Sequence, residues 1–164
     1  MGKIEIYCGS GRGKTTLAIG RSLQASTQNK SVIVIQFLKG KDKRGLDYLE
    51  KLDSADIKIF RFEKMDACYE ELTPEEKEEE SINILNGVNF ARKVVATQEC
   101  DFLVLDEILG LLDYGIISLD SIVEILKLRN DSMDIILTGI NCPEELTAYA
   151  NKVTVITTVF TKEE

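Results

Sequence analysis

The strongest constraint on the fold is a regular alternation between short β-branched, apolar runs and longer stretches with helical patterning. Such alternation is typical of the α/β class, in which a mostly parallel sheet carries helices on both faces. We therefore predict about six mostly parallel strands. They cover residues 3–7, 31–37, 57–61, 101–105, 133–137 and 152–157.

Helices are predicted in the intervals between these strands, and two of them have marked starts. Thr73 followed by Pro74 and Glu76 combines an N-cap, a proline at the first helical position and a capping-box acid. Residues 142–145 open the last helix with a proline and two acids, which favour the positive end of a helix dipole. The predicted helices cover residues 14–27, about 45–52, 74 to about 97, 120–129 and 143–150.

Length and composition limit the class of protein. The chain has 164 residues, which fits one domain over residues 1–164, and it contains no apolar run of the roughly 20 residues that span a bilayer. The N-terminus enters a strand at once, without the pattern of a signal peptide. We therefore expect a cytoplasmic protein with no membrane partner.

Charge and residue usage exclude some functions. A net charge of −8 argues against binding to a nucleic-acid backbone, so no nucleic-acid partner is expected. The chain has no histidine, so imidazole cannot serve as acid, base or metal ligand. Its four cysteines lie far apart and indicate buried free thiols rather than a zinc site.

A glycine-rich loop lies between the first predicted strand and the first predicted helix. It reads Gly9-Ser10-Gly11-Arg12-Gly13-Lys14-Thr15-Thr16, and Cys8 stands where such loops usually have another glycine. Glycines let backbone amides approach phosphates, and the helix start is electropositive. Lys14 is placed to reach the phosphates and the Thr15 hydroxyl to ligate Mg²⁺. The motif predicts a P-loop, RecA-like, three-layer fold.

Further polar residues follow other predicted strands. Asp106 and Glu107 come directly after an apolar strand, at the sheet edge where ligands bind in open α/β folds. We expect Asp106 to hold Mg²⁺ together with Thr15, whereas Glu107 either orients a water or holds a nucleoside sugar. Lys39 follows the second strand at the same edge and is expected to receive an anionic group.

Four motifs, taken in order, resemble the ATP:corrinoid adenosyltransferases of the P-loop type. They are the glycine loop, Gln-Phe-Leu-Lys-Gly at residues 36–40, Val-Leu-Asp-Glu at residues 104–107, and Leu-Thr-Gly at residues 137–139. The resemblance spans residues 3 to about 156. Members of that family also lack the first glycine of the ordinary loop, as this chain does at Cys8.

The resemblance implies transfer of the 5′-deoxyadenosyl group of ATP to the cobalt of a reduced corrinoid, with release of triphosphate. It implies ATP as co-substrate, Mg²⁺ as cofactor and a homodimer. By similarity, Lys14, Thr15 and Glu107 are the catalytic residues, and Glu107 contacts the ribose. The implied ATP-binding residues are Gly9, Ser10, Gly11, Arg12, Gly13, Lys14, Thr15, Thr16 and Lys39.

The chain departs from this family after the third predicted strand and at its end. The family's Gly-Phe-Thr-Trp segment is replaced by Phe-Arg-Phe-Glu-Lys-Met at residues 60–65, and the chain contains no tryptophan. The C-terminal extension usual in the family is short here. Phe62, Met65 and Tyr69 are then the candidates for contact with the corrinoid, although Phe62 can equally cover the core beside the long helix.

Two other functions remain open on the sequence. One is a P-loop NTPase or kinase that cleaves at the γ-phosphate, with Glu107 positioning the attacking water. The other is a non-catalytic ATP-binding module. The phosphate product formed from ATP distinguishes these functions, because only adenosyl transfer leaves triphosphate.

Overall fold

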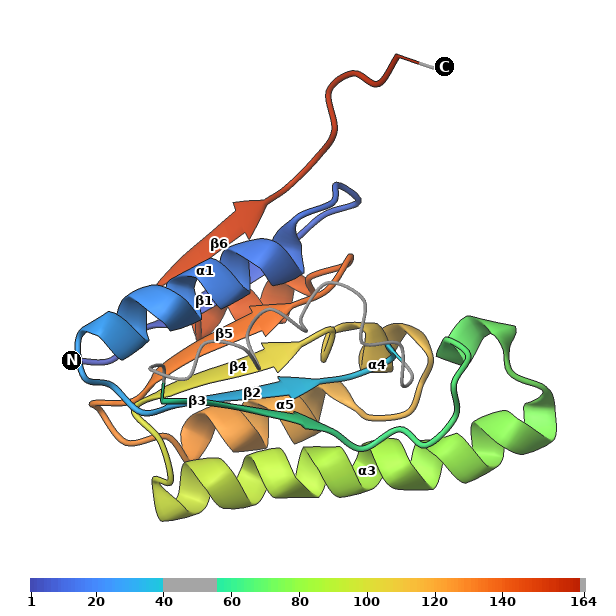
Figure 1. Cartoon of the computed structure of the whole chain (residues 1–164), viewed down its shortest axis with the longest axis horizontal. Coiled ribbons are helices and arrows are strands. Elements are labelled where there is room, and N and C mark those ends of the chain that lie inside the picture. Colours follow the sequence, from blue (N-terminus) through green and yellow to red (C-terminus); the bar gives the residue numbers. More distant parts are fainter. Residues whose placement is uncertain (40–55, 163–164) are drawn as a thin grey trace.

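The computed structural model describes residues 1–39 and 56–162, which form a parallel sheet between layers of helices (Figure 1). The strands are β1 (Ile4–Cys8), β2 (Val32–Gln36), β3 (Ile57–Arg61), β4 (Phe102–Asp106), β5 (Asp134–Thr138) and β6 (Lys152–Val155). Their order in the sheet is β3-β2-β4-β5-β1-β6, and all neighbours pair in parallel. This confirms the predicted α/β class with six parallel strands.

The helical elements connect these strands. The longest, α3, starts at the predicted capping box: the Thr73 hydroxyl accepts from the Glu76 amide, and the Glu76 carboxylate accepts from the Thr73 amide. The α-helices are α1 (Lys14–Thr27), α3 (Pro74–Thr97), α4 (Gly110–Asp113) and α5 (Leu119–Lys127), and the 3₁₀ helices are η1 (Tyr69–Glu71) and η2 (Glu144–Ala148).

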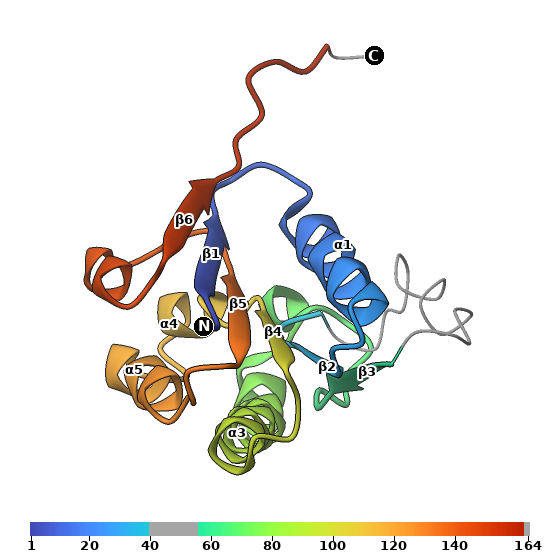
Figure 2. The ribbon, with the colours of Figure 1, turned by 90° about the vertical axis from the view of Figure 1, so that its left-hand side faces the viewer.

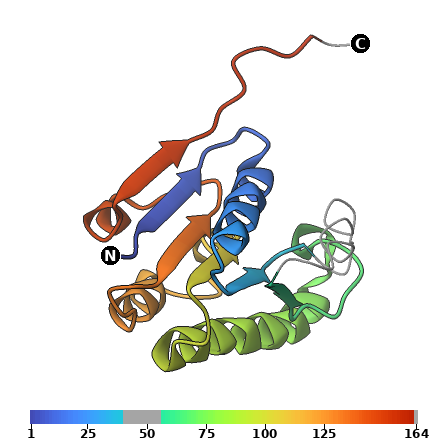
Figure 3. The same cartoon turned by 60° about the vertical axis from the view of Figure 1, so that its left-hand side comes forward.

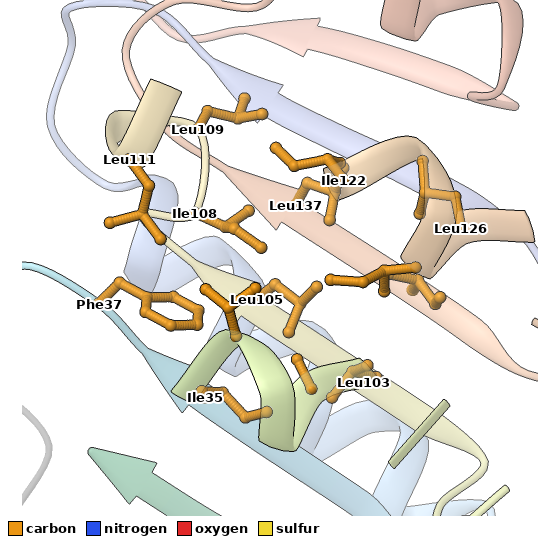
Figure 4. Packing of buried hydrophobic residues seen from close by; sticks show 14 of the residues in the cluster. Ile35, Phe37, Leu103, Leu105, Ile108, Leu109, Leu111, Ile122, Leu126 and Leu137 are labelled. Atoms are coloured by element: carbon orange, nitrogen blue, oxygen red, sulfur yellow. The ribbon is translucent and has the colours of Figure 1, made fainter. Parts of the chain in front are cut away.

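The sheet is apolar on both faces because both are covered. Helix α1 lies on one face, where Ala18 and Ile19 belong to the same buried cluster as Val34 and Val104 (Figure 2). Helices α3 and α5 lie on the opposite face. Figure 4 shows the sheet side chains of that face packed with residues of α5; the labelled members from these elements are Ile35, Leu103, Leu105, Ile122, Leu126 and Leu137.

One predicted helix is not tested by the structure, and two other elements differ from the sequence prediction. The predicted helix at residues 45–52 lies outside the described residues. The predicted helix at 143–150 is the 3₁₀ helix η2, because Asn151 must return at once to β1, where its amide donates to the Ile4 carbonyl at 2.7 Å. Helix α4 was not predicted, since its four residues have no side-chain N-cap.

Candidate functional site

The carboxyl ends of β1, β2, β4 and β5 lie side by side, because the strands are parallel and adjacent in the sheet (Figure 3). The register places Gln36 of β2 opposite Asp106 of β4, and Tyr7 of β1 opposite Thr138 of β5. Polar residues that are distant in sequence therefore meet at one edge, where ligands bind in open α/β sheets.

The glycine loop turns between β1 and α1 with two glycines in the left-handed region. Gly9 and Gly13 both have φ of 106°, which a residue with a side chain rarely adopts. The Gly9 amide donates to the Ile140 carbonyl at 2.8 Å, and the Gly11 amide donates to the Ile156 carbonyl at 2.9 Å. A Cβ on Gly9 would lie 2.3 Å from the Ile156 oxygen, so the loop can take this path only with glycine there.

Lys14 is buried at the centre of this loop. Its ammonium donates to the carbonyls of Gly9 and Gly11 at 2.6 and 2.7 Å. The first amides of α1 follow directly, and the first amides of any helix have no partner within it. A cation and free amides at a helix start can together hold a phosphate chain. The other loop side chains, Ser10, Arg12 and Thr16, are exposed.

Asp106 is the most connected group at this edge, and its side chain is fully buried. The hydroxyls of Thr15 and Thr138 donate to it at 3.0 and 2.7 Å, and the Gln36 amide donates at 2.9 Å. The Lys39 ammonium pairs with it at 2.7 Å. The structure thus brings together Thr15, Asp106 and Lys39, which the sequence placed on three separate segments.

The sequence analysis did not identify the roles of three residues around Asp106, namely Gln36, Thr138 and Arg61. Gln36 donates to Asp106 and accepts from the Arg61 guanidinium at 2.8 Å, so its amide is held in one orientation. Thr138 bridges the Asp106 side chain and the Glu107 backbone amide. For Gln36 and Thr138 the available signal was a polar residue as the last residue of a buried strand, whereas β3, which ends at Arg61, is only partly buried.

The oxygens of Thr15 and Asp106 fit a hard divalent cation such as Mg²⁺, which prefers oxygen ligands. In the structure the positively charged Lys39 ammonium contacts these same oxygens, at 2.7 Å from Asp106 Oδ2 and 2.5 Å from Thr15 Oγ1. Among the described residues no group of three or more His, Cys, Asp or Glu could hold a metal. A metal bound here therefore needs further ligands from phosphate or water.

Lys39 is directed toward this pair by its backbone. The preceding residue, Leu38, has φ of 65°, and its amide donates to the Glu63 carboxylate at 2.6 Å. Burial raises the pKa of Glu63, although the hydrogen bond from Leu38 opposes the shift. Glu63 thus fixes the turn that carries Lys39.

Glu107 follows Asp106 in the left-handed region, with φ of 63°, and its amide donates to the Thr138 hydroxyl at 2.8 Å. Burial raises the pKa of Glu107; the Asp106 charge adds to this shift, and Lys39 and Lys14 oppose it. The side chain lines a cavity of about 560 Å³. A carboxylate in this setting can accept hydrogen bonds from hydroxyl groups of a ligand.

The cavity lies at the end of the sheet, where Lys39 and Glu107 are among the residues that line it. Tyr69 and Tyr114 form an aromatic wall, with ring centroids 5.0 Å apart, and the Tyr114 hydroxyl donates to Glu70. The residues lining the cavity are Leu38, Lys39, Cys68, Tyr69, Glu70, Glu107, Gly110, Asp113, Tyr114, Ile140 and Asn141.

The three residues expected to contact a corrinoid are placed differently. Tyr69 lines the cavity, whereas Phe62 and Met65 do not. Phe62 packs on α3, where its ring lies 5.4 Å from that of Phe90, and a Cβ on Gly87 would lie 2.9 Å from it. This placement favours the core alternative for Phe62.

Comparison with known proteins gives a consistent family. A family model described as ATP:corrinoid adenosyltransferase BtuR/CobO/CobP matches residues 1–162. The corrinoid adenosyltransferase of Escherichia coli K12 is 26% identical over 152 residues, which cover 93% of this chain and 74% of that protein. Corrinoid adenosyltransferase CobA of Salmonella typhimurium LT2 gives the same values.

A further relative carries no functional description. The uncharacterized protein all2391 of Nostoc sp. PCC 7120 is 29% identical over 169 residues, which cover 92% of this chain and 42% of that protein. In the described part of this chain, no helix is both long and apolar enough to cross a membrane.

Proposed function

The chain belongs to the ATP:corrinoid adenosyltransferase family BtuR/CobO/CobP, and we propose that it moves the 5′-deoxyadenosyl group of ATP to the cobalt of a reduced corrinoid, releasing triphosphate. The observation that carries this proposal is that a group of residues suited to phosphate and Mg²⁺ lies next to a cavity, at the same edge of the sheet. Lys14, Thr15, Asp106 and Lys39 form a cationic, oxygen-lined cradle, and the 560 Å³ cavity beside it contains Glu107.

The triphosphate is proposed to lie on the glycine loop and the first turn of α1. Lys14 then exchanges the carbonyls of Gly9 and Gly11 for phosphate oxygens. The ammonium stays hydrogen-bonded because each bond to a carbonyl is replaced by one to phosphate. No unpaired charge is then left in the buried loop.

Thr15 and Asp106 are the residues that hold Mg²⁺ in this proposal. The bound ion neutralises charge on the phosphate oxygens and so favours departure of triphosphate. Asp106 is held in place by donors from Thr138 and Gln36, and its Oδ1 also accepts from the Thr15 hydroxyl.

Glu107 is proposed to accept hydrogen bonds from the ribose. Its backbone amide donates to the Thr138 hydroxyl, and its side chain lines the cavity together with Lys39. Holding the sugar there places C5′ at the mouth of the cavity, with the triphosphate behind it. Tyr114, which is exposed, then offers aromatic surface to the corrinoid ring, and the buried Tyr69 ring packs beside it.

The step needs no protein base. Cobalt(I) donates an electron pair to C5′, the cobalt–carbon bond forms, and the C5′–O bond breaks with its electrons leaving on triphosphate. The cobalt is formally oxidised by two electrons and no proton is transferred. The protein supplies alignment and charge stabilisation, which agrees with a chain that contains no histidine.

The test is to mix the protein with Mg-ATP and chemically reduced cobalamin, and to identify both products. We expect a cobalt–carbon bond, seen in the absorption spectrum, and one triphosphate for each bond formed. Lys14→Ala is the control, because it removes the cation of the cradle and should abolish both products.

Formation of ADP and phosphate without a cobalt–carbon bond would instead show an NTPase, with Glu107 positioning water. Its raised pKa and its place beside Asp106 are the features that such a role would use. Binding of ATP with neither product would show a non-catalytic module.

A further inference from the structure

The Lys39 ammonium occupies the position between the two oxygen groups assigned to the metal. It lies 2.7 Å from Asp106 Oδ2 and 2.5 Å from Thr15 Oγ1, and these two groups also contact each other at 3.0 and 3.1 Å. The three groups form a closed cluster at the end of the sheet.

A divalent cation binding to the same oxygens would meet this ammonium at short range. Both ions are positive and would have to share the oxygens of the fully buried Asp106 side chain, so they would repel each other at contact distance although the Lys39 side chain is partly exposed. The oxygens of Thr15 and Asp106 therefore cannot serve the ammonium and the metal at the same time.

We propose that Lys39 is a built-in competitor for the divalent metal, which keeps the Thr15–Asp106 pair closed to the free ion and yields it only when a phosphate chain receives the ammonium. This inference rests on the proposed metal role of Thr15 and Asp106. It adds a coupling between metal binding and nucleotide binding, because the phosphates give Lys39 another partner as the metal takes its place.

The structure allows the side chain to move while its backbone stays fixed. The turn before Lys39 is held by the hydrogen bond from the Leu38 amide to Glu63. The Lys39 side chain is 30% exposed and lines the 560 Å³ cavity, so there is space beside it. A rotation of the side chain alone takes the ammonium away from Asp106.

Metal binding without nucleotide tests the competition directly. Mn²⁺ serves as the probe for the Mg²⁺ site, and its free concentration is measured by electron paramagnetic resonance. We expect weak binding to the wild-type protein and binding tighter by roughly tenfold or more in Lys39→Met and Lys39→Gln, which remove the competing charge. Lys39→Arg should stay weak. Lys127→Met, on the exposed surface of α5, is the matched control for loss of one charge and should also stay weak.

Two further measurements separate this inference from the proposed function. The double variant Lys39→Met/Asp106→Asn should lose the tighter Mn²⁺ binding of Lys39→Met. That loss would show that the added Mn²⁺ binds at Asp106. With ATP present, Asp106→Asn should weaken Mn²⁺ binding in the otherwise wild-type protein. Suppose that Asp106→Asn weakens Mn²⁺ binding with ATP, but that both neutral Lys39 variants bind free Mn²⁺ as weakly as wild type. The proposed competition by Lys39 is then wrong, and the metal role of Asp106 stands. If Asp106→Asn changes nothing with ATP, the metal role and the competition both fall.

Discussion

At the scale of single residues, Glu107 gives the sharpest expectation about pH. Burial and the neighbouring Asp106 charge raise its pKa in the folded protein above the value in the unfolded chain. The folded state therefore binds the Glu107 proton more tightly than the unfolded chain does. The stability that this proton contributes is fully present at pH values below the pKa of Glu107 in the unfolded chain, and it is lost as the pH rises through the pKa of Glu107 in the folded protein. Glu107→Gln does not titrate and should avoid this loss.

We therefore expect Glu107→Gln to gain in stability relative to wild type as pH rises from about 4 to 7. Urea unfolding at several pH values measures the difference. Glu145→Gln, on the exposed surface of η2, is the control and should show no such trend. The same Glu107 variant should keep adenosyl transfer within about tenfold, since an amide still bonds ribose hydroxyls, whereas losing a general base costs about 10²–10⁴-fold.

The sequence indicated Asp106 and Lys39 at this sheet edge, but not the neutral residues Gln36 and Thr138 that contact Asp106. Asp106 and Lys39 could be predicted because charged residues after apolar strands indicate the ligand edge of a parallel sheet. Gln36 and Thr138 were missed as partners of Asp106, because their contacts depend on the pairing of β2, β4 and β5. A sequence reveals the end of a strand, but not which strand lies next to it.

At the scale of elements, helix α3 and its contact with Phe62 carry the next prediction. Phe62 is half-buried against Phe90 and Gly87. Phe62→Ala should therefore lower the free energy of unfolding by about 2 kcal/mol, less than the loss for a fully buried phenylalanine, and leave ATP affinity and adenosyl transfer unchanged.

Thermal and urea unfolding measure the stability of this variant, and calorimetric titration measures its affinity for ATP. Phe160→Ala is the matched control, because that ring is 81% exposed and should contribute little. A Phe62→Ala protein of wild-type stability that no longer adenosylates cobalamin would contradict the core role and restore Phe62 as a corrinoid contact.

Elements with strong local signals could be predicted, and those fixed by tertiary contacts could not. The capping box at Thr73 and Glu76 is formed by residues three apart, so it is visible in the sequence and present in the structure. Helix η2 also starts with acidic residues, but the Asn151 amide donates to a carbonyl of β1 shortly after it. The chain therefore has room only for a short 3₁₀ helix. Here the return of the chain to the sheet overrides local preference.

At the scale of the whole molecule, the proposed ligand should stabilise the fold by mass action. At a hundredfold excess over its dissociation constant, Mg-ATP adds about 2.7 kcal/mol to the free energy of unfolding. For a chain of this length that corresponds to a rise in Tm of roughly 5–10 °C. Differential scanning calorimetry measures the shift. Lys14→Ala at the same ATP concentration should show little of it, and a wild-type Tm independent of ATP would contradict the proposed binding.

The strand order is the part of the fold that the sequence did not predict. Alternating strands and helices predict a parallel sheet with helices on both faces, yet many orders satisfy that description. In the structure β1 lies between β5 and β6, and the backbone of Ile156, beyond β6, closes against the glycine loop. Those contacts join opposite ends of the chain and leave no local pattern.

This strand order has a kinetic consequence for the glycine loop. The Ile4 amide bonds to the Asn151 side chain, 147 positions away, and each sheet neighbour of β1 comes from the last third of the chain. Such distant pairings close late in folding, because the entropy of a long loop must be overcome first. During synthesis β1 emerges well before β5 and β6, so it has no sheet neighbour until those strands have left the ribosome. The strand that leads into the glycine loop is therefore made early and acquires its native surroundings late.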